Sequence, residues 1–221
     1  MTDKTFTRLA QFTLPSRLLH WAMAIMVVAQ LFIAAIMVAS LAYYPLLLSI
    51  HKPLGIAILV FVVIRIGNRL LHRPPPFLST MSPLERVVST WSERLLYALL
   101  LLQPLVGWAM LSAAGDPLVI YGQLRLPPVA PDDTSVYAIL RQSHTVLAYL
   151  LFATFTAHMC AVLFHTLVLR DRLLDRMALW RVRGTEQGAE STDEAESIDT
   201  ALVDDEQPGM IGGREESRLE S

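Results

Sequence analysis

The sequence of 221 residues has little cysteine, few charged residues and almost no net charge. Its single cysteine, Cys160, excludes an intrachain disulfide, a cysteine-rich zinc site and a cysteine-bound iron–sulfur cluster. A net charge of −2 excludes a strongly basic nucleic-acid-binding protein. Only 17% of the residues are charged, against about 25% in an average soluble domain. With 53% apolar residues, the chain is neither an ordinary soluble domain nor a disordered one.

Three long intervals contain no charged residue, and they run from Arg17 to Lys52, from Arg94 to Asp116 and from Arg141 to Arg170. Each encloses about 20 or more mostly apolar residues, the length of helix that crosses a bilayer core. A fourth, shorter run reaches Arg65 and becomes a span if residues 50–71 all belong to it, with Arg65 snorkelling or paired. The sequence therefore predicts an all-α bundle of four transmembrane helices, at about residues 18–43, 50–71, 94–114 and 144–169.

The lysines and arginines of the connections predict the orientation. The N-terminal segment, the second connection and the segment after the last span together contain 13 of them. The first and third connections, which lie on the other side of the membrane, contain 3. Cytoplasmic connections are the ones enriched in these residues. We therefore expect a multi-pass protein of the bacterial inner membrane with both termini in the cytoplasm. The first span is too long for the apolar core of a cleaved signal, so we expect it to be retained.

The connections and the C-terminal region differ sharply in composition. Three consecutive prolines, residues 74–76, end the second helix, and a short amphipathic piece is expected at residues 82–92. The third connection, residues 115–135, mixes glycine, proline and apolar residues and is expected to fold back on the outer membrane surface. Residues 184–221 are acidic and polar, so we expect a disordered tail that masks the basic charge of the membrane domain, residues 1–183.

Two of the six histidines share one face of the predicted fourth helix. His144 and His158 are 14 residues apart, which is about 40° short of four turns and a rise of about 21 Å. This helix therefore offers imidazoles at two depths. By the predicted topology, His51 lies at the outer depth at the start of the second span, and His20 lies at the inner depth at the start of the first.

Paired imidazoles at two depths between facing helices are typical of bis-histidine haem ligation. Two axial ligands leave the iron no open position, which favours electron transfer over oxygen activation. His51 and His144 would form the outer pair. The inner pair stays open at this point, because depth alone favours His165 over His158 as the partner of His20.

Basic residues accompany the histidines, and haem propionates need cations or hydrogen-bond donors. The candidates, each near one of these histidines in the sequence or on a helix face, are Arg17, Lys52, Arg65 and Arg141. Lys52 and Arg141 stand out because they lie on the side that has few basic residues. The alternative for each is an ordinary charge anchor at the membrane edge. Zinc is a weaker interpretation of the histidines, because no carboxylate shares their faces.

These residues resemble the prokaryotic cytochrome b561 family, a set of four-helix inner-membrane cytochromes with two b-type haems. The resemblance covers residues 12–180, and its motifs include residues 17–21, 51–55, 103–108, 143–144 and 158–165. It implies that His20 and His158 hold the inner haem, and that His51 and His144 hold the outer one. His165 then becomes a candidate contact for a propionate or a quinone.

Glu93 departs from the family pattern, because members often carry a histidine four residues before the tyrosine of the third span, here Tyr97. That histidine is not one of the four ligands, so the departure does not affect the implied haem ligation. The role of the position is open in this chain.

The resemblance implies transmembrane electron transfer that links a quinone pool to a donor on the periplasmic side, of the quinol- or superoxide-oxidising type. Whether the protein is a quinone-linked oxidoreductase in its own right is left open. One alternative is a haem-bearing membrane-anchor subunit of a dehydrogenase or hydrogenase, although such subunits usually have an additional span. Another is a histidine-lined transporter or metal carrier, against which the lack of intramembrane acidic residues argues. The sequence does not decide whether the chain forms a homodimer or docks a redox partner protein.

Overall fold

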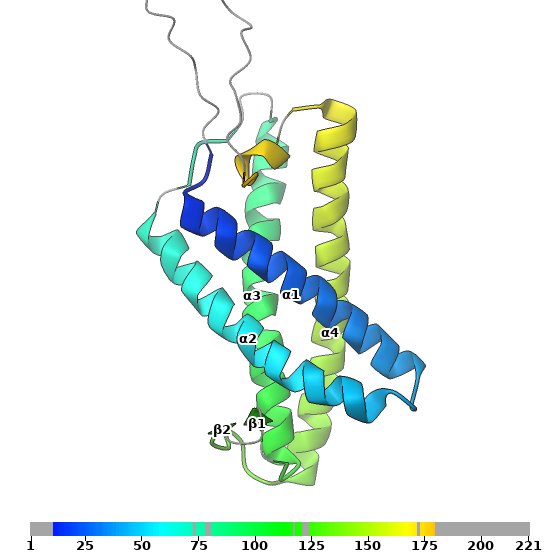
Figure 1. The fold of residues 1–221 in the computed structure, drawn as a ribbon. Helices are drawn as coiled ribbons and strands as arrows, with labels where there is room; N and C mark the ends of the chain where they lie inside the picture. The colour runs from blue at the N-terminus through cyan, green and yellow to red at the C-terminus, as the bar shows by residue number, and fades with distance from the viewer. Residues whose placement is uncertain are drawn as a thin grey trace, which may run out of the picture. The chain divides into compact units, whose positions relative to one another are not determined.

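Four long helices make up most of the described part of the chain (Figure 1). The structure is a computed structural model that describes residues 11–72, 74–77, 81–116, 118–120, 124–171 and 173–179. The helices are α1 (Leu14–Ala39), α2 (Tyr44–Leu71), α3 (Pro83–Ala113) and α4 (Thr134–Leu163), and α4 continues as a π-helix, η1 (Phe164–Leu169). All four are long and apolar enough to cross a membrane, so the predicted four-helix fold is confirmed. The predicted tail, residues 184–221, lies outside the described residues.

Two of the helices, α3 and α4, begin at capping residues rather than at the edges of the apolar runs. Ser82 starts α3 with a capping box, in which its side chain accepts from the Glu85 backbone N–H and its own N–H donates to the Glu85 carboxylate. Asp133 starts α4 by accepting from two backbone N–H groups of the first turn. Both helices therefore begin well before the predicted spans, and the amphipathic piece expected at residues 82–92 is the first part of α3.

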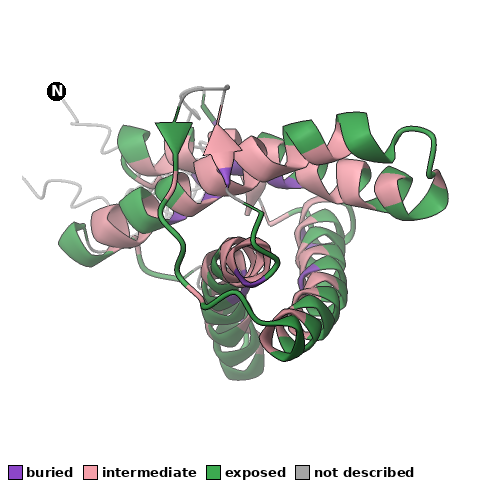
Figure 2. Ribbon diagram, turned by 90° about the horizontal axis from the view of Figure 1, so that it is seen from below, coloured by how far each residue is buried: buried purple, intermediate pink, exposed green. Residues whose placement is uncertain are grey.

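The four helices pack as two pairs. α1 lies against α2, α3 lies against α4, and the pairs meet along α2 and α3. In Figure 1 the α1–α2 pair crosses the α3–α4 pair obliquely, and Figure 2 shows the two pairs as separate layers. The buried apolar side chains of the helices include Met23, Val27, Ile58, Val62, Leu99 and Leu151.

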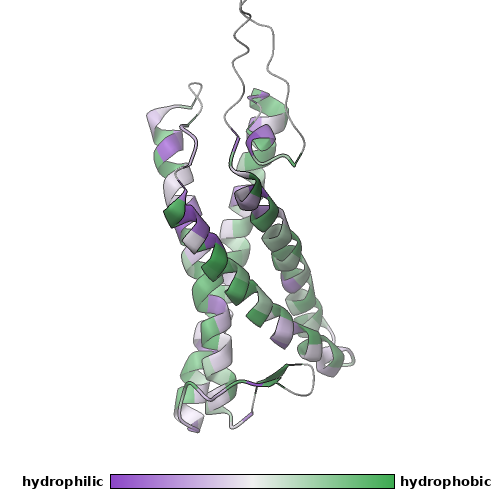
Figure 3. Cartoon of the chain, turned by 60° about the vertical axis from the view of Figure 1, so that its left-hand side comes forward, coloured by the Kyte–Doolittle hydropathy of each residue, from purple (hydrophilic) through white to green (hydrophobic). Residues whose placement is uncertain are grey.

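Much of the apolar surface faces outward. Val38 is 86% exposed and Leu70 is 82% exposed, and large exposed apolar side chains occur on all four helices. Apolar residues dominate the middle of the helices in Figure 3. A surface of this size marks contact with lipid in a chain whose helices have spanning length.

The two ends of the bundle are distinguished by their connections. The hairpin end carries the turn at residues 40–43 and a two-stranded antiparallel sheet of β1 (Val119–Ile120) and β2 (Leu124–Arg125). The sheet was not part of the all-α prediction. Its connection folds back on α3, where Trp108 Nε1 donates to the carbonyl oxygen of Pro127 at 3.1 Å. The terminus end carries the start of α1, the end of η1 and the α2–α3 connection.

A strap, residues 173–179, follows η1 at the terminus end and binds the start of α1. Arg170 has a left-handed backbone, with φ of 52°, and ends the π-helix before the strap begins. The strap contains a single 3₁₀ turn, η2 (Leu174–Arg176). Its backbone carbonyl oxygens accept hydrogen bonds from Gln11 Nε2, Phe12 N, Arg17 Nη1 and Trp21 Nε1, at distances of 2.8, 3.2, 2.7 and 2.8 Å.

Arg176 joins the strap to the α2–α3 connection. Its side chain is buried, and its Nη2 donates to the carbonyl oxygens of Pro75 and Pro76 at 3.1 and 2.6 Å. Its guanidinium carbon lies 5.8 Å from the centre of the Phe12 ring. Burial lowers the pKa of Arg176, so the hydrogen bonds and the ring contact must offset the cost of removing this charge from water.

Replacing Arg176 by alanine is expected to lower the free energy of unfolding by about 2 to 3 kcal/mol, because two hydrogen bonds from a charged group are lost and their carbonyl acceptors stay behind. The unfolding midpoint of the detergent-solubilised protein should fall by about 5 to 10 °C. Arg125→Ala is the control, because Arg125 is exposed on β2. Equal midpoints for the two variants would show that the strap contributes no stability through Arg176.

Candidate functional site

His51 of α2 and His144 of α4 face one another near the hairpin end. Their ring centres are 6.4 Å apart and their ring planes are inclined by 77°. Two imidazoles that share one metal ion, through nitrogen–metal bonds of about 2 Å, have ring centres a little over about 6 Å apart. The Nδ1 atoms of both rings are buried without a hydrogen-bond partner among the described residues. The pair predicted as the outer ligands is thus brought together at a separation that suits a shared iron.

Two glutamines hold the backbone beside this pair. Gln30 Nε2 of α1 donates to the carbonyl oxygen of His51 at 3.1 Å. Gln103 Nε2 of α3 donates to the carbonyl oxygen of His144, also at 3.1 Å. In the sequence, Gln103 lies within a family motif, whereas Gln30 was not predicted as a site residue. The sequence pattern that could have identified Gln30 is its polar amide within an otherwise apolar membrane span.

The predicted cations at the hairpin end have different surroundings. Lys52 Nζ lies 2.7 Å from Asp116 Oδ2, and the two side chains are 18% and 50% exposed. This ion pair joins α2 to the segment after α3 and neutralises the charge beside His51. Arg141 is exposed, and its side chain forms no hydrogen bond or ion pair with the described residues. Arg141 is therefore the more available cation at this end.

His20 of α1 and His158 of α4 both lie toward the terminus end, without a ring contact of the kind that His51 and His144 make. Arg65 of α2 contacts His20, with its Nη2 3.2 Å from His20 Nδ1. A guanidinium only donates, so Nδ1 of His20 must accept and a neutral ring then carries its proton on Nε2. Ligation through Nε2 requires that Arg65 release this contact. His20 and His158 thus differ from the other pair, whose Nδ1 atoms are unpartnered.

Arg65 connects three helices at this point. Its Nη1 donates to the carbonyl oxygen of Ser16 at 3.1 Å, and its Nε donates to Tyr97 Oη at 3.0 Å. Asn68, one turn further along α2, donates to Ser16 Oγ at 2.6 Å. The residue predicted as a propionate contact is therefore also the main polar link between α1, α2 and α3.

Glu93, the departure from the family pattern, pairs with Arg69. Both oxygens of its carboxylate accept from the Arg69 guanidinium, at 3.2 and 3.1 Å. The guanidinium carbon of Arg69 also lies 6.0 Å from the centre of the Phe12 ring. These three residues line a small pocket together with Arg65 and Tyr97. Glu93 thus gives this end of the site a carboxylate that a histidine would not provide.

The remaining two candidates, Arg17 and His165, do not contact one another. Each contacts residues of the strap or of the segment just before it. Arg17 Nη1 donates to strap residue Ala178, and also to Gln11 Oε1 at 3.2 Å. His165 is buried in η1, where its Nδ1 lies 2.5 Å from Asp171 Oδ2. Short π-helical segments at the end of or within α-helices occur frequently at functional sites.

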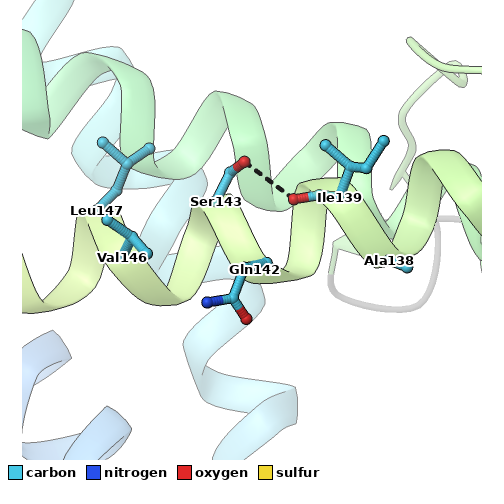
Figure 4. Close-up of a pocket in the computed structure, with 6 residues that line it drawn as sticks. All are labelled: Ala138, Ile139, Gln142, Ser143, Val146 and Leu147. Atoms are coloured by element: carbon cyan, nitrogen blue, oxygen red, sulfur yellow. Dashed lines mark hydrogen bonds between the residues drawn. The ribbon is translucent and has the colours of Figure 1, made fainter.

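One surface hollow lies away from all of these residues. It is a shallow apolar groove on α4, lined by Ala138, Ile139, Gln142, Ser143, Val146 and Leu147 (Figure 4). Gln142 and Val146 each lie two residues from His144, which is about 200° around the helix. The groove therefore occupies the opposite face of α4 and takes no part in the histidine site.

Spanning helices that bring His51 of α2 and His144 of α4 together define a helical membrane protein with a pair of imidazoles in its interior. The sequence matches the family model of prokaryotic cytochrome b561 over residues 11–179, and the chain belongs to this family. The predicted resemblance is confirmed. The protein is therefore a membrane-embedded b-type cytochrome that binds haem b and transfers electrons.

Two curated relatives agree with this assignment. The chain is 29% identical over 160 residues to a Yersinia pestis protein named probable superoxide oxidase CybB, covering 72% of this chain and 90% of that protein. It is 27% identical over 165 residues to cytochrome b561 homolog 2 of Escherichia coli (strain K12), covering 72% and 86% of the two chains. The similarity thus extends over nearly the whole length of both relatives.

Proposed function

We propose that this cytochrome carries electrons across the bacterial inner membrane between a periplasmic donor and a quinone pool, using two haem b groups. The observation that carries the proposal is the distance of 6.4 Å between the ring centres of His51 and His144. Haem b supplies a one-electron redox couple when bound. His51 and His144 would hold the outer haem, and His20 and His158 the inner one.

The hairpin end is proposed to face the periplasm and the terminus end the cytoplasm, since the lysines and arginines are concentrated at the latter. Arg141 would attract an anionic donor, because Lys52 is neutralised by Asp116. Superoxide is one such anion, and the name of the Yersinia pestis relative supports it as the donor. Arg65 would move from His20 Nδ1 to an inner propionate, which frees the imidazole for ligation.

His165 is our candidate for the hydrogen-bonding partner of a quinone at the terminus end. Its side chain is buried, and its Nδ1 lies 2.5 Å from Asp171 Oδ2. The opposite ring nitrogen, Nε2, would then carry the hydrogen bond to a quinone oxygen.

The proposal is tested by purifying the full chain from membranes and measuring haem content and the dithionite-reduced absorption spectrum. Two b-type haems per chain and a split α-band are expected. Superoxide or quinol should then reduce the protein faster than the same reagents do after heat denaturation. One haem per chain, or no reduction by either donor, would contradict the proposal. A large subunit that co-purifies would favour the alternative role as a membrane anchor.

The His165→Ala variant extends the same experiment to the quinone site. Haem content should stay at two per chain, while electron exchange with quinone slows at least about tenfold, as for loss of a positioned proton donor. Unchanged quinone kinetics would remove His165 from the site, and loss of a haem would make it a ligand.

A further inference from the structure

His165 has one ring nitrogen in contact with a carboxylate and the other without a partner. The residue is 9% exposed, and its Nδ1 lies 2.5 Å from Asp171 Oδ2. Its Nε2 makes no hydrogen bond with any residue that the structure describes. Polar atoms of buried side chains normally have a partner, so this nitrogen is a place where a ligand binds.

The end of η1 creates the contact between His165 and Asp171. The two are six residues apart, and in a continuous α-helix they would lie about 240° apart around the axis. The helix instead ends at Arg170, whose left-handed backbone turns the chain back. The backbone N–H of Asp171 then donates to the His165 carbonyl oxygen at 3.3 Å. The π-helical end therefore brings an acid beside an imidazole that a regular helix would keep apart.

The strap fixes the orientation of the Asp171 carboxylate. Its Oδ1 accepts from the backbone N–H of Leu173 at 3.1 Å, and its Oδ2 faces the ring. An ionised carboxylate only accepts, so Nδ1 of His165 must donate to it. The neutral ring then holds its proton on Nδ1, and Nε2 is the nitrogen that takes up and releases a proton.

We propose that Asp171 is a positioning residue that keeps a proton on His165 Nδ1, so that His165 delivers protons to the quinone through Nε2. The inference rests on the proposed function, because it takes His165 as the partner of the quinone. Asp171 does not itself touch the quinone.

The proton transfer follows from the conversion of a quinone to a quinol, which takes up two electrons and two protons. The electrons come from the periplasmic donor. When Nε2 of His165 also carries a proton, its N–H bond breaks as an O–H bond forms on a quinone oxygen. The ring returns to the form that is protonated on Nδ1 alone. Water on the cytoplasmic side then protonates Nε2 again, and the second transfer completes the quinol.

Asp171→Asn is the variant that separates hydrogen bonding from proton transfer. Its amide oxygen can still accept from the Leu173 N–H, which turns the NH₂ group toward His165. Nδ1 must then accept, so the neutral ring carries its only proton on Nε2. That proton still forms a hydrogen bond to a quinone oxygen, but its transfer would leave an imidazolate. The same inversion of a tautomer explains the loss of activity when the aspartate of a serine-protease triad becomes asparagine.

The test uses the purified haem-loaded full chain, reduced with dithionite, freed of excess reductant and mixed with decylubiquinone in a stopped-flow instrument. In Asp171→Asn the limiting rate of haem oxidation should fall at least about tenfold, while the half-saturating quinone concentration stays at the parental value. His165→Ala should change both quantities. The double variant should be no slower than His165→Ala, because the two residues act as a unit.

Nitrogen NMR of the reduced protein, labelled with ¹⁵N-histidine, reports the tautomer without any quinone. The signal that is missing in His165→Ala identifies His165. It should show a protonated Nδ1 in the parent and an unprotonated Nδ1 in Asp171→Asn. If Asp171→Asn does not accumulate, Asp171→Ser replaces it, since a serine hydroxyl can accept from Leu173 N–H but takes the carboxylate away from the ring.

Arg176→Ala is the matched control, because it removes hydrogen bonds that hold the strap without changing Asp171 or His165. Below its unfolding midpoint it should keep the parental limiting rate. A parental limiting rate in Asp171→Asn, or an unprotonated Nδ1 in the parent, would overturn the inference. Unchanged kinetics in His165→Ala would overturn both the inference and the quinone site of the proposed function. A parent chain without haem would contradict the proposed function alone, and the nitrogen signal would still show whether Asp171 sets the tautomer.

Discussion

Replacing His144 by alanine is expected to reduce the haem content from two per chain to one. His144 faces His51 across 6.4 Å, so its removal leaves a single imidazole where iron requires a pair. Electron transfer from superoxide to quinone should fall at least about a hundredfold. Without the outer haem, an electron would have to tunnel from the periplasmic side directly to the inner haem. The pyridine haemochrome assay gives the ratio, and stopped-flow absorbance gives the rate.

His51→Ala should have the same effect as His144→Ala, because the two rings form one site. His72→Ala is the control, since His72 is exposed at the end of α2 and its Nδ1 only contacts the Asn68 carbonyl oxygen. It should keep two haems and the parental rate. If His144→Ala also kept two haems, the pairing of α2 with α4 would be wrong as a ligand assignment.

Replacing Arg65 by methionine is expected to lower the free energy of unfolding by about 3 kcal/mol. Three hydrogen bonds from a charged group are lost, and Tyr97 Oη and the Ser16 carbonyl oxygen lose their donor. The unfolding midpoint should fall by about 6 to 12 °C. The inner haem should also be held less tightly, because a propionate would lose its cation.

Arg65→Lys separates the effect of charge from that of shape. Lysine keeps the positive charge but has no planar fork, so it cannot donate to Ser16, Tyr97 and His20 together. It should recover the binding of the inner haem more than it recovers stability. An Arg65→Met variant with the parental unfolding midpoint would show that the hydrogen bonds of Arg65 do not hold α1, α2 and α3 together. Midpoints are compared in one detergent at one protein concentration.

The fold was predictable because each helix that crosses the bilayer needs a long run of apolar residues. Charge-free intervals identify the membrane spans, and a helix of constant pitch places His144 and His158 on one face. The topology then places His51 at the depth of His144, whereas depth leaves His20 with two possible partners, His158 and His165. The identification of the spans needs only helix length and the absence of charge, so it succeeds without tertiary information.

The parts that the sequence analysis missed depend on contacts between distant residues. The Lys52–Asp116 ion pair and the hydrogen bonds of the strap join residues that are far apart in the chain. Helix caps such as Ser82 lie outside the apolar runs, so hydropathy underestimates helix length. Gln103 lay within a family motif, but only the structure shows which of its amide atoms faces His144.

The strap has a consequence for the biosynthesis of the protein. Its hydrogen-bond partners lie at the start of α1, which leaves the ribosome first, whereas residues 173–179 follow all four helices. During insertion, the side chains of Arg17 and Trp21 therefore cannot donate to the strap carbonyl oxygens until α4 has entered the membrane. In a nascent chain that stops before residue 173, the start of α1 lacks its hydrogen bonds to the strap. The bundle is thus completed only after its last helix and the strap have been synthesised.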